Sequence, residues 1–334
     1  MKVAIVHDDL VQWGGGERIL EGITEIYPDA PIYTSVFDRD NVTLQRIFGS
    51  KNIGTSFLQN IPGWKIFYKA LLPFYPIAFE QFDFTGFDLV VSHTTRFAKA
   101  IITKPQTKHI SFIHTPPRFL WHFSGLGHYG IGEIIMNWLR IVDRVSAERV
   151  DYFLAGSENA KKRIKKVYRR DSKVVYPYID LERFKNIKTT EGEYFVIIGR
   201  PNKYKRFDLA EKACKNLGLE LKVISGGLED SAVIKLLAGC TALIIPGIED
   251  FGLTSLEAQA LGKPVIAYKE GGVLETVIDG KTGVFFDEPR VDSLIEVLKN
   301  FNASNFDSND CILNAQGFSK ENFIRNFKQT VASL

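Results

Sequence analysis

The stretch Ile244-Ile-Pro-Gly-Ile-Glu-Asp-Phe-Gly-Leu-Thr-Ser-Leu-Glu-Ala-Gln-Ala-Leu-Gly-Lys-Pro264 decides the fold class, because it predicts a buried strand, a loop and a helix in succession. The strand covers residues 242–246 and the helix covers residues 254–261. Glu249 therefore lies in the loop and Glu257 in the first helical turn. Open α/β sheets bind ligands at the carboxyl ends of their strands, where two carboxylates accept hydrogen bonds from several sugar hydroxyls. The stretch predicts a site for a polyhydroxylated ligand.

Strand-like runs alternate with longer helical patterns along the whole chain, which favours parallel sheets with helices on both faces. The pattern restarts after the polar segment 188–193. We therefore expect an α/β protein with two doubly wound, Rossmann-like domains, residues 1–183 and 184–318, facing one another across a cleft. Residues 319–334 predict an amphipathic helix that returns to the first domain. The predicted strands are 2–6, 89–92, 109–113, 152–155, 194–199, 220–225, 242–246 and 264–268.

The composition predicts a globular protein without a global electrostatic partner. The 334 residues include 42 Lys and Arg against 39 Asp and Glu, a net charge of +3 that gives no reason to expect nucleic acid. The first residues predict a strand rather than a signal peptide, and no run of about 18 apolar residues is present to span a bilayer. We expect a cytoplasmic protein, with any membrane contact peripheral. Three widely spaced cysteines are expected to be reduced packing residues.

A glycine-rich loop follows the first predicted strand. Trp13-Gly-Gly-Gly-Glu-Arg18 leads into a helix expected over 18–27, so backbone N–H groups and the positive end of the helix dipole lie at the strand end. Gly14, Gly15 and Gly16 would let a phosphate or a sugar approach the main chain. The loop differs from the G-x-G-x-x-G pattern of dinucleotide-binding enzymes. A simple tight turn is the alternative interpretation.

Cations gather after the first strand of the second domain. Arg200, Lys205 and Arg206 lie between the strand 194–199 and a helix expected over 207–217. A guanidinium binds phosphate oxygens bidentately and an ammonium supplies a point charge, so these cations suit a diphosphate that leaves without a metal. A solvated basic turn is the alternative. Combined with the two glutamates, the cations indicate a nucleotide sugar.

His114 and Arg118 lie on the loop after the predicted strand 109–113. At this edge of the sheet His114 could hydrogen-bond a sugar hydroxyl, although a single histidine is more often structural. Arg118 could contact an acidic or phosphorylated acceptor.

Three further segments have simpler interpretations. Asp38-Arg-Asp40 resembles a cation-binding Asp-x-Asp, but it lies in the domain away from the proposed diphosphate site and is interpreted as a turn. Residues 161–170 contain seven cations beside one apolar helical face, which is typical of a solvated helix. The aromatic and lysine residues of 64–75 could lie at a membrane surface or bind a lipid carrier; core burial is the alternative.

Taken together, these motifs resemble the retaining family-4 glycosyltransferases of the GT-B fold, particularly the mannosyltransferases of O-antigen and exopolysaccharide assembly. The resemblance runs nearly end to end, with the motifs in family order. They are Val3-Ala-Ile-Val-His-Asp8, Gly14-Gly-Gly-Glu-Arg18, His114-Thr-Pro-Pro-Arg118, Tyr176-Pro-Tyr-Ile-Asp180, Tyr204-Lys-Arg-Phe-Asp208, Glu249-Asp-Phe-Gly252 and Glu257-Ala258.

The resemblance implies a role for each candidate residue. Arg200 and Lys205 would hold the donor diphosphate, Glu249 the donor sugar and Glu257 the ribose hydroxyls. His114 would lie near the primary hydroxyl of the sugar. The loop from Gly14 to Gly16 would lie beside the reacting centre. Phe251, Gly252 and Leu253 complete the set of residues expected to bind the donor.

The implied activity is transfer of a hexose, expected to be mannose from GDP-mannose, to a hydroxyl of a lipid-linked glycan in cell-surface polysaccharide synthesis. Retention by front-face attack, assisted by the leaving diphosphate, requires no catalytic metal and no cofactor. One departure from the family is a shortened segment between Gly226 and Leu236, beside the expected nucleobase. The alternatives are a nucleotide-sugar epimerase of the same fold and a non-catalytic glycan-binding or scaffold subunit.

Overall fold

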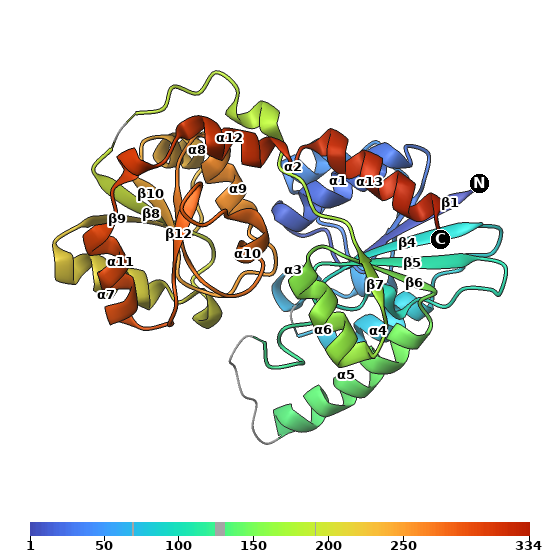
Figure 1. Ribbon diagram of the computed structural model, residues 1–334. Helices are drawn as coiled ribbons and strands as arrows, with labels where there is room; N and C mark the ends of the chain where they lie inside the picture. Colours follow the sequence, from blue (N-terminus) through green and yellow to red (C-terminus); the bar gives the residue numbers. More distant parts are fainter. Residues whose placement is uncertain (69, 124–130, 191) are drawn as a thin grey trace. The chain divides into compact units, whose positions relative to one another are not determined.

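A computed structural model describes residues 1–68, 70–123, 131–190 and 192–334 (Figure 1). The chain forms two compact units. The first unit contains residues 1–175 and 324–334, and the second unit contains residues 176–323. Each unit has its own parallel sheet with helices on both faces, so the prediction of two doubly wound α/β sheets is confirmed.

The sheet of the first unit has seven strands in the order β3-β2-β1-β4-β5-β6-β7, and every neighbouring pair is parallel. Its central strands are buried along almost their whole length, as expected for a parallel sheet covered on both faces. The strands are β1 (Val3–His7), β2 (Ile32–Thr34), β3 (Ile53–Thr55), β4 (Leu89–Thr94), β5 (Lys108–Ile113), β6 (Tyr152–Ala155) and β7 (Ser172–Val174).

The helices of the first unit include the C-terminal helix, which packs back as predicted. The ring of Phe327 packs edge-to-face against Phe112 at 6.1 Å, and Lys173 Nζ donates to Ser333 Oγ at 2.9 Å. The helix α1 begins three residues before the predicted start at Arg18. The helices are α1 (Gly15–Ile26), α2 (Val42–Phe48), α3 (Trp64–Phe67), α4 (Tyr75–Glu80), α5 (Ile131–Glu148), α6 (Glu158–Tyr168) and, shared with the second unit, α13 (Lys320–Ala332).

The sheet of the second unit has five parallel strands in the order β12-β11-β10-β8-β9. Its strands are β8 (Tyr194–Ile198), β9 (Glu220–Ile224), β10 (Ala242–Ile245), β11 (Val265–Tyr268) and β12 (Gly283–Phe286). Its helices are α7 (Phe207–Leu217), α8 (Asp230–Ala238), α9 (Leu253–Ala260), α10 (Val273–Thr276), α11 (Val291–Asn300) and α12 (Ser308–Gln316). The apolar strand residues form separate core layers on the two faces of this sheet.

Both sheets contain a topological switch point, where successive connections leave neighbouring strands in opposite directions. In the first unit the chain moves from β1 outward to β3 and then returns to β4 on the other side of β1. In the second unit it moves from β8 to β9 and returns to β10 on the other side of β8. Ligands of open α/β sheets bind at the carboxyl ends of the strands beside such points.

Candidate functional site

The clearest polar contact at the switch point of the second unit joins Lys205 and Glu249. Lys205 ends a short 3-10 helix (Lys203–Lys205) in the loop after β8, and Glu249 lies in the loop after β10. Lys205 Nζ donates a hydrogen bond to Glu249 Oε1, and both side chains are largely buried. The structure thus brings together a cation and a carboxylate that the sequence predicts for one ligand.

A glycine allows the two loops to approach. A Cβ atom on Gly247 would lie 2.1 Å from the Tyr204 carbonyl oxygen and 2.6 Å from Lys205 Cα. Distances this short are forbidden, so any larger residue at this position would displace the backbone that carries Lys205. Gly199 has φ +138°, a conformation that favours glycine, and lies beneath the Lys205 side chain.

A second pair of glycines holds the backbone of Glu249. Gly272 N donates to Glu249 O at 2.9 Å, and a Cβ on Gly271 would lie 2.6 Å from the same oxygen. Gly271 also has φ +84°. The carboxylate of Glu249 therefore extends from a backbone segment that is fixed on both sides.

Glu257 is held by an arginine that the sequence analysis missed. Arg183 Nη1 donates to Glu257 Oε1 at 2.7 Å, while Nε and Nη2 donate to the two carboxylate oxygens of Asp230 at 2.9 and 2.5 Å. These contacts link the 3-10 helix Leu181–Phe184 to the start of α8 and to the middle of α9, so Glu257 lies beyond the first helical turn in which the sequence placed it. Arg183 is separated by 47 and 74 residues from its partners, so no local sequence signal could reveal the contact.

The remaining predicted donor residues occupy different environments. Arg200 is exposed just after β8. The Phe251 side chain is buried, stacked on Tyr176 at 5.6 Å and packed edge-to-face on Phe318. Gly252 has φ +105° and is the N-cap of α9, which Leu253 begins. The Phe251 ring therefore stabilises the loop, while the donor-binding roles of Phe251, Gly252 and Leu253 stay predictions.

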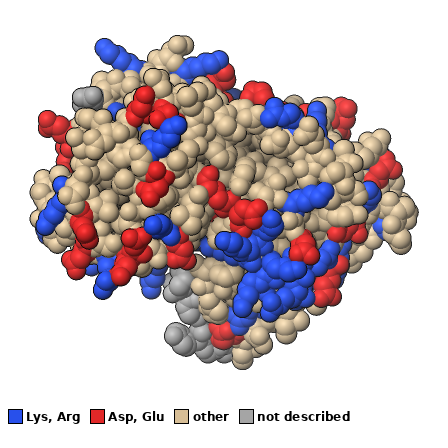
Figure 2. All heavy atoms as spheres, in the orientation of Figure 1, with Lys and Arg blue, Asp and Glu red and all other residues tan. Residues whose placement is uncertain are grey.

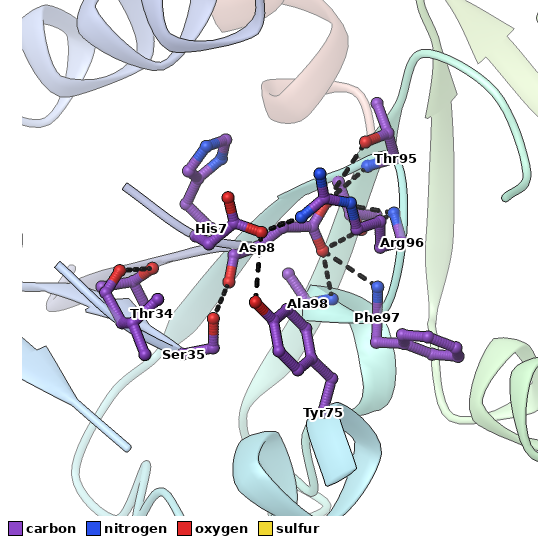
Figure 3. A network of polar contacts seen from close by, with 12 residues as sticks. His7, Asp8, Thr34, Ser35, Tyr75, Thr95, Arg96, Phe97 and Ala98 are labelled. Atoms are coloured by element: carbon purple, nitrogen blue, oxygen red, sulfur yellow. Dashed lines mark hydrogen bonds and ion pairs between the residues drawn. The ribbon is translucent and has the colours of Figure 1, made fainter. Parts of the chain in front are cut away.

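At the switch point of the first unit, Asp8 organises the loop that follows β4 (Figure 3). Its two carboxylate oxygens accept hydrogen bonds from the Thr94 hydroxyl and from the backbone N–H groups of residues 95–98, at 2.7–3.0 Å. Burial acts to raise the pKa of Asp8, but the positive charge of Arg96, together with His7 and the hydrogen bonds, lowers it overall. Asp8 thus remains charged and holds the loop.

Asp9 contributes a second carboxylate to the same network. It forms an ion pair with Arg96 and accepts a hydrogen bond from Tyr75 Oη at 3.4 Å. Burial raises the pKa of Tyr75 to about 12. The aromatic segment 64–75 therefore supplies at least one core residue, as its alternative interpretation predicts.

Three histidines form a chain beside Asp8: His7 of β1, His93 of β4 and His114 in the loop after β5. His93 Nδ1 lies 3.1 Å from His7 Nδ1, and His93 Nε2 lies 2.6 Å from His114 Nε2. Burial is the largest cause that holds the pKa of His93 well below its usual range, and the charges of His114 and His7 act in the same direction. His93 is therefore neutral at physiological pH. His114 thus has a buried neighbour that fixes its ring, and the sequence analysis did not identify His93.

The glycine loop lies at the start of α1. Gly14 is the N-cap, and Glu17 in the first turn lies with its Oε1 atom 3.9 Å from His7 Nε2. A Cβ on Gly16 would meet no atom within 4 Å. No atom of the described residues therefore requires a glycine at position 16. This free space is compatible with the predicted approach of a ligand to Gly14, Gly15 and Gly16.

Other candidate motifs have structural roles. Lys65 forms ion pairs with both Asp38 and Asp40, and this segment is a turn, as predicted. Among the described ranges, no cluster of three or more histidine, cysteine, aspartate or glutamate residues is arranged to hold a metal ion. Within the same ranges, no helix has the length and apolarity needed to cross a bilayer.

A family comparison matches the part of the chain that contains Lys205, Glu249 and Glu257. Residues 156–318 match the family described as "Glycosyl transferases group 1". This region, just under half of the chain, is similar to group 1 glycosyltransferases. The fold of the whole chain is GT-B: it is similar to HepE from Anabaena, solved in complex with UDP, with a TM-score of 0.70, 16% identity and full coverage of both chains.

Two curated relatives give local matches. The alpha-1,3/1,6-mannosyltransferase ALG2 of Dictyostelium discoideum is 49% identical over 78 residues, which cover 23% of this chain and 18% of the relative. The lipopolysaccharide 1,2-N-acetylglucosaminetransferase of Salmonella typhimurium is 31% identical over 118 residues, which cover 33% of this chain and 31% of the relative. Each match spans less than a third of the relative's own length.

Proposed function

We propose that this protein is a retaining glycosyltransferase that moves a hexose from a nucleotide sugar to a hydroxyl of a glycan. The observation that carries the proposal is the contact between Lys205 and Glu249, because it places a cation and a carboxylate together at the switch point of a unit similar to group 1 glycosyltransferases. The cation suits the diphosphate of the donor, and the carboxylate suits hydroxyl groups of its sugar.

The proposed reaction breaks the bond between the sugar C1 atom and the diphosphate oxygen. Negative charge develops on that oxygen, and Lys205 and Arg200 stabilise it. The acceptor oxygen then bonds to C1 on the same face, and its proton passes to the departing diphosphate. Glu249 orients the sugar during the exchange. The products are a glycoside of unchanged anomeric configuration and a free nucleoside diphosphate.

Glu257 is proposed to bind the ribose of the donor. Arg183 already occupies its Oε1 atom, and a carboxylate has further acceptor positions for hydroxyl groups. Because Arg183 also binds Asp230, it fixes the carboxylate of Glu257 before the donor arrives. Preorganisation of this kind lowers the entropy lost on binding.

The proposed donor is GDP-mannose. The family resemblance of the motifs and the local similarity to ALG2, a mannosyltransferase, support mannose. The HepE structure was solved with UDP, so a uridine nucleotide is the other base to test. Comparison of GDP-mannose with GDP-glucose tests the sugar, and comparison of GDP-glucose with UDP-glucose tests the base.

The proposed acceptor is a lipid-linked glycan of a cell-surface polysaccharide, reached by a cytoplasmic protein at the membrane surface. The name of the Salmonella relative, a lipopolysaccharide sugar transferase, supports this class of acceptor. The first unit is assigned to the acceptor and to the reacting sugar, with His114 and the loop from Gly14 to Gly16 as its candidate residues. His93 would act as a positioning residue for His114.

The proposal is tested by incubating the purified protein with each nucleotide sugar in the absence of an acceptor, so that water replaces the acceptor hydroxyl. Proton NMR then identifies the first sugar anomer released. We expect slow hydrolysis of GDP-mannose with the anomeric configuration of the donor, and loss of hydrolysis in Glu249→Ala. Release of the opposite anomer would contradict retention. Conversion of a nucleotide sugar to free epimerised sugar would favour the epimerase.

A further inference from the structure

The helix α5 exposes an apolar stripe to solvent. Ile134, Trp138, Ile141 and Val145 are exposed by 70, 44, 57 and 47%. Their spacing of four, three and four residues places them on one face of the helix. Soluble proteins rarely expose a continuous row of large apolar residues without a binding partner.

The orientation of α5 is fixed by contacts on its opposite face. Asp143 is fully buried and accepts hydrogen bonds from Trp121 Nε1 at 2.8 Å and from Tyr168 Oη at 2.9 Å. It also forms a buried ion pair with Lys99. Rotating α5 to bury the stripe would break all three contacts and leave a buried charge unpaired, which is strongly destabilising. The stripe is therefore a stable feature of the surface.

A cationic surface lies on the neighbouring helix α6. Lys162, Lys166 and Arg169 are exposed, and none has an ion-pair partner among the residues that the structure describes. Lys161 and Lys165 add further positive charge, partly balanced by Glu158 and Asp171. Figure 2 shows Lys and Arg side chains gathered in one continuous patch where Figure 1 places α6.

The stripe and the cationic surface lie on neighbouring helices, because side-chain contacts join α5 and α6. Arg144 of α5 donates to the carbonyl oxygen of Tyr168 at the end of α6. Arg170, which follows α6, donates to Ala147 O at 3.2 Å and to Val150 O at 2.7 Å, at the end of α5. We refer to α5 and α6 together as the α5–α6 face.

We propose that the α5–α6 face docks on an anionic phospholipid bilayer, with the stripe entering the acyl boundary and the cations contacting the headgroups. This proposal rests on the peripheral membrane contact in the proposed function and names the face that makes it. Apolar residues beside lysine and arginine are the combination that binds interfacial helices to anionic membranes. A nucleic acid would use the cations but not the stripe.

Charge also argues against a second copy of the chain as the partner. A two-fold interface brings the same surface of both copies together. Pairing two α5–α6 faces would bring the exposed cations Lys162, Lys166 and Arg169 of both copies close to one another. An anionic bilayer instead complements that charge.

The segment 64–75 provides the competing membrane surface within the same unit. Ile66, Phe67 and Phe74 are exposed, whereas Trp64 and Tyr75 are buried in the core. Because its larger aromatic residues stabilise the fold, this segment offers fewer side chains for insertion. Substitutions in the segment 64–75 therefore serve as the control that tests whether the bilayer contacts the α5–α6 face or another surface of the same unit.

The test measures flotation of the full chain with phosphatidylcholine vesicles and with vesicles that also contain phosphatidylglycerol. We expect binding only to the anionic vesicles. Each cation near an anionic surface contributes about a fivefold gain in partitioning, so the triple variant Lys162→Gln/Lys166→Gln/Arg169→Gln should lose about a hundredfold. The matched control Lys212→Gln/Lys215→Gln/Lys235→Gln removes the same charge from exposed positions of the second unit and should bind like the wild type.

The apolar stripe is tested separately. Trp138→Ser/Ile141→Ser should lose vesicle binding, whereas Ile66→Ser/Phe67→Ser should keep it. Trp138→Phe, which keeps the fold and the apolar character, should bind but lose the blue shift of tryptophan emission that vesicles induce. Loss of binding only in Ile66→Ser/Phe67→Ser would overturn the proposal. So would a wild-type dimer in solution that Trp138→Ser/Ile141→Ser converts to a monomer. Vesicle binding is measured without a sugar donor, so failure here leaves the transfer reaction untouched.

Discussion

Lys205 and Glu249 form an ion pair across the two loops that leave β8 and β10 in opposite directions. The charges of the two residues therefore neutralise one another in the protein alone. A donor whose diphosphate binds Lys205 would release the Glu249 carboxylate, which could then accept a hydrogen bond from a sugar hydroxyl. The pair links the fold to the proposed chemistry, because the topology places these loops side by side and Gly247 permits their close contact.

The first prediction concerns this pair. Lys205→Ala and Glu249→Ala should each lower the rate of sugar transfer about 10²–10³-fold, because each removes one charge that acts on the donor. Circular dichroism and thermal melting should show both variants folded. Lys203→Ala, an exposed lysine of the same loop, is the matched control and should transfer like the wild type. Wild-type rates in both site variants would refute the assignment.

The second prediction concerns Gly247. Alanine at this position should destabilise the protein by about 1–3 kcal/mol, because its Cβ would overlap the Tyr204 carbonyl and force the Lys205 backbone to move. The affinity for the donor should fall in the same variant. Gly132→Ala is the control: a Cβ there meets no atom within 4 Å, and alanine is the better helix former. Chemical denaturation measures the stability of both variants. An unchanged denaturation midpoint for Gly247→Ala would contradict the steric argument.

The third prediction concerns Arg183. Arg183→Met leaves Glu257 without its partner, so the KM for the donor should rise while kcat changes less, since the residue acts on binding through Glu257. The free energy of unfolding should fall by about 1–3 kcal/mol. Lys185→Met removes a solvent-exposed pair with Glu182 and should change stability by less than about 0.5 kcal/mol. A fall in kcat alone would show that Arg183 does not serve donor binding.

The fourth prediction concerns pH. Burial lowers the pKa of His109 from its ordinary value of 6.5 to about 3. Between pH 6.5 and pH 3 the unfolded chain therefore binds a proton at His109 that the folded chain does not bind. The contribution of His109 to the free energy of unfolding is fully present above pH 6.5 and is lost as the pH falls toward 3. At pH 5 the loss from this residue is about 2 kcal/mol.

His109→Gln separates this contribution from that of His93, which acts in the same direction. The amide can still bond to Ser92 Oγ, which lies 2.8 Å from His109 Nε2. Denaturation at pH 7 and pH 5 should show a smaller acid loss in the variant than in the wild type. Equal losses would mean that His109 is protonated in the folded state.

The sequence predicted most strands of the two sheets because buried parallel strands have a strong local signature, but it predicted no strand at β3, β7 or β12. The strand at residues 152–155 and the helix over 207–217 were predicted to the residue. Most other predicted strands differ by one or two residues at an end. Start signals of helices are weaker: α1 begins within the glycine loop, and α9 begins at Leu253 rather than Thr254.

The sequence could not predict contacts that only the tertiary fold creates. Glu249 and Lys205 were identified separately, but their ion pair depends on the close approach at Gly247. Arg183 and His93 were missed because neither lies in a recognisable motif and each contacts partners far away in the chain. The burial of Phe251 was also not readable from a loop sequence, since its aromatic partners come from distant segments.

The most direct test of the central claim is calorimetric binding of GDP-mannose, UDP-glucose and UDP-N-acetylglucosamine to the wild type and to Lys205→Ala, with and without magnesium. We expect selective, metal-independent binding of GDP-mannose that is weakened at least tenfold in Lys205→Ala. Absence of binding to every nucleotide sugar would contradict a transferase and favour the non-catalytic subunit. Binding that Lys205→Ala leaves unchanged would place the donor elsewhere.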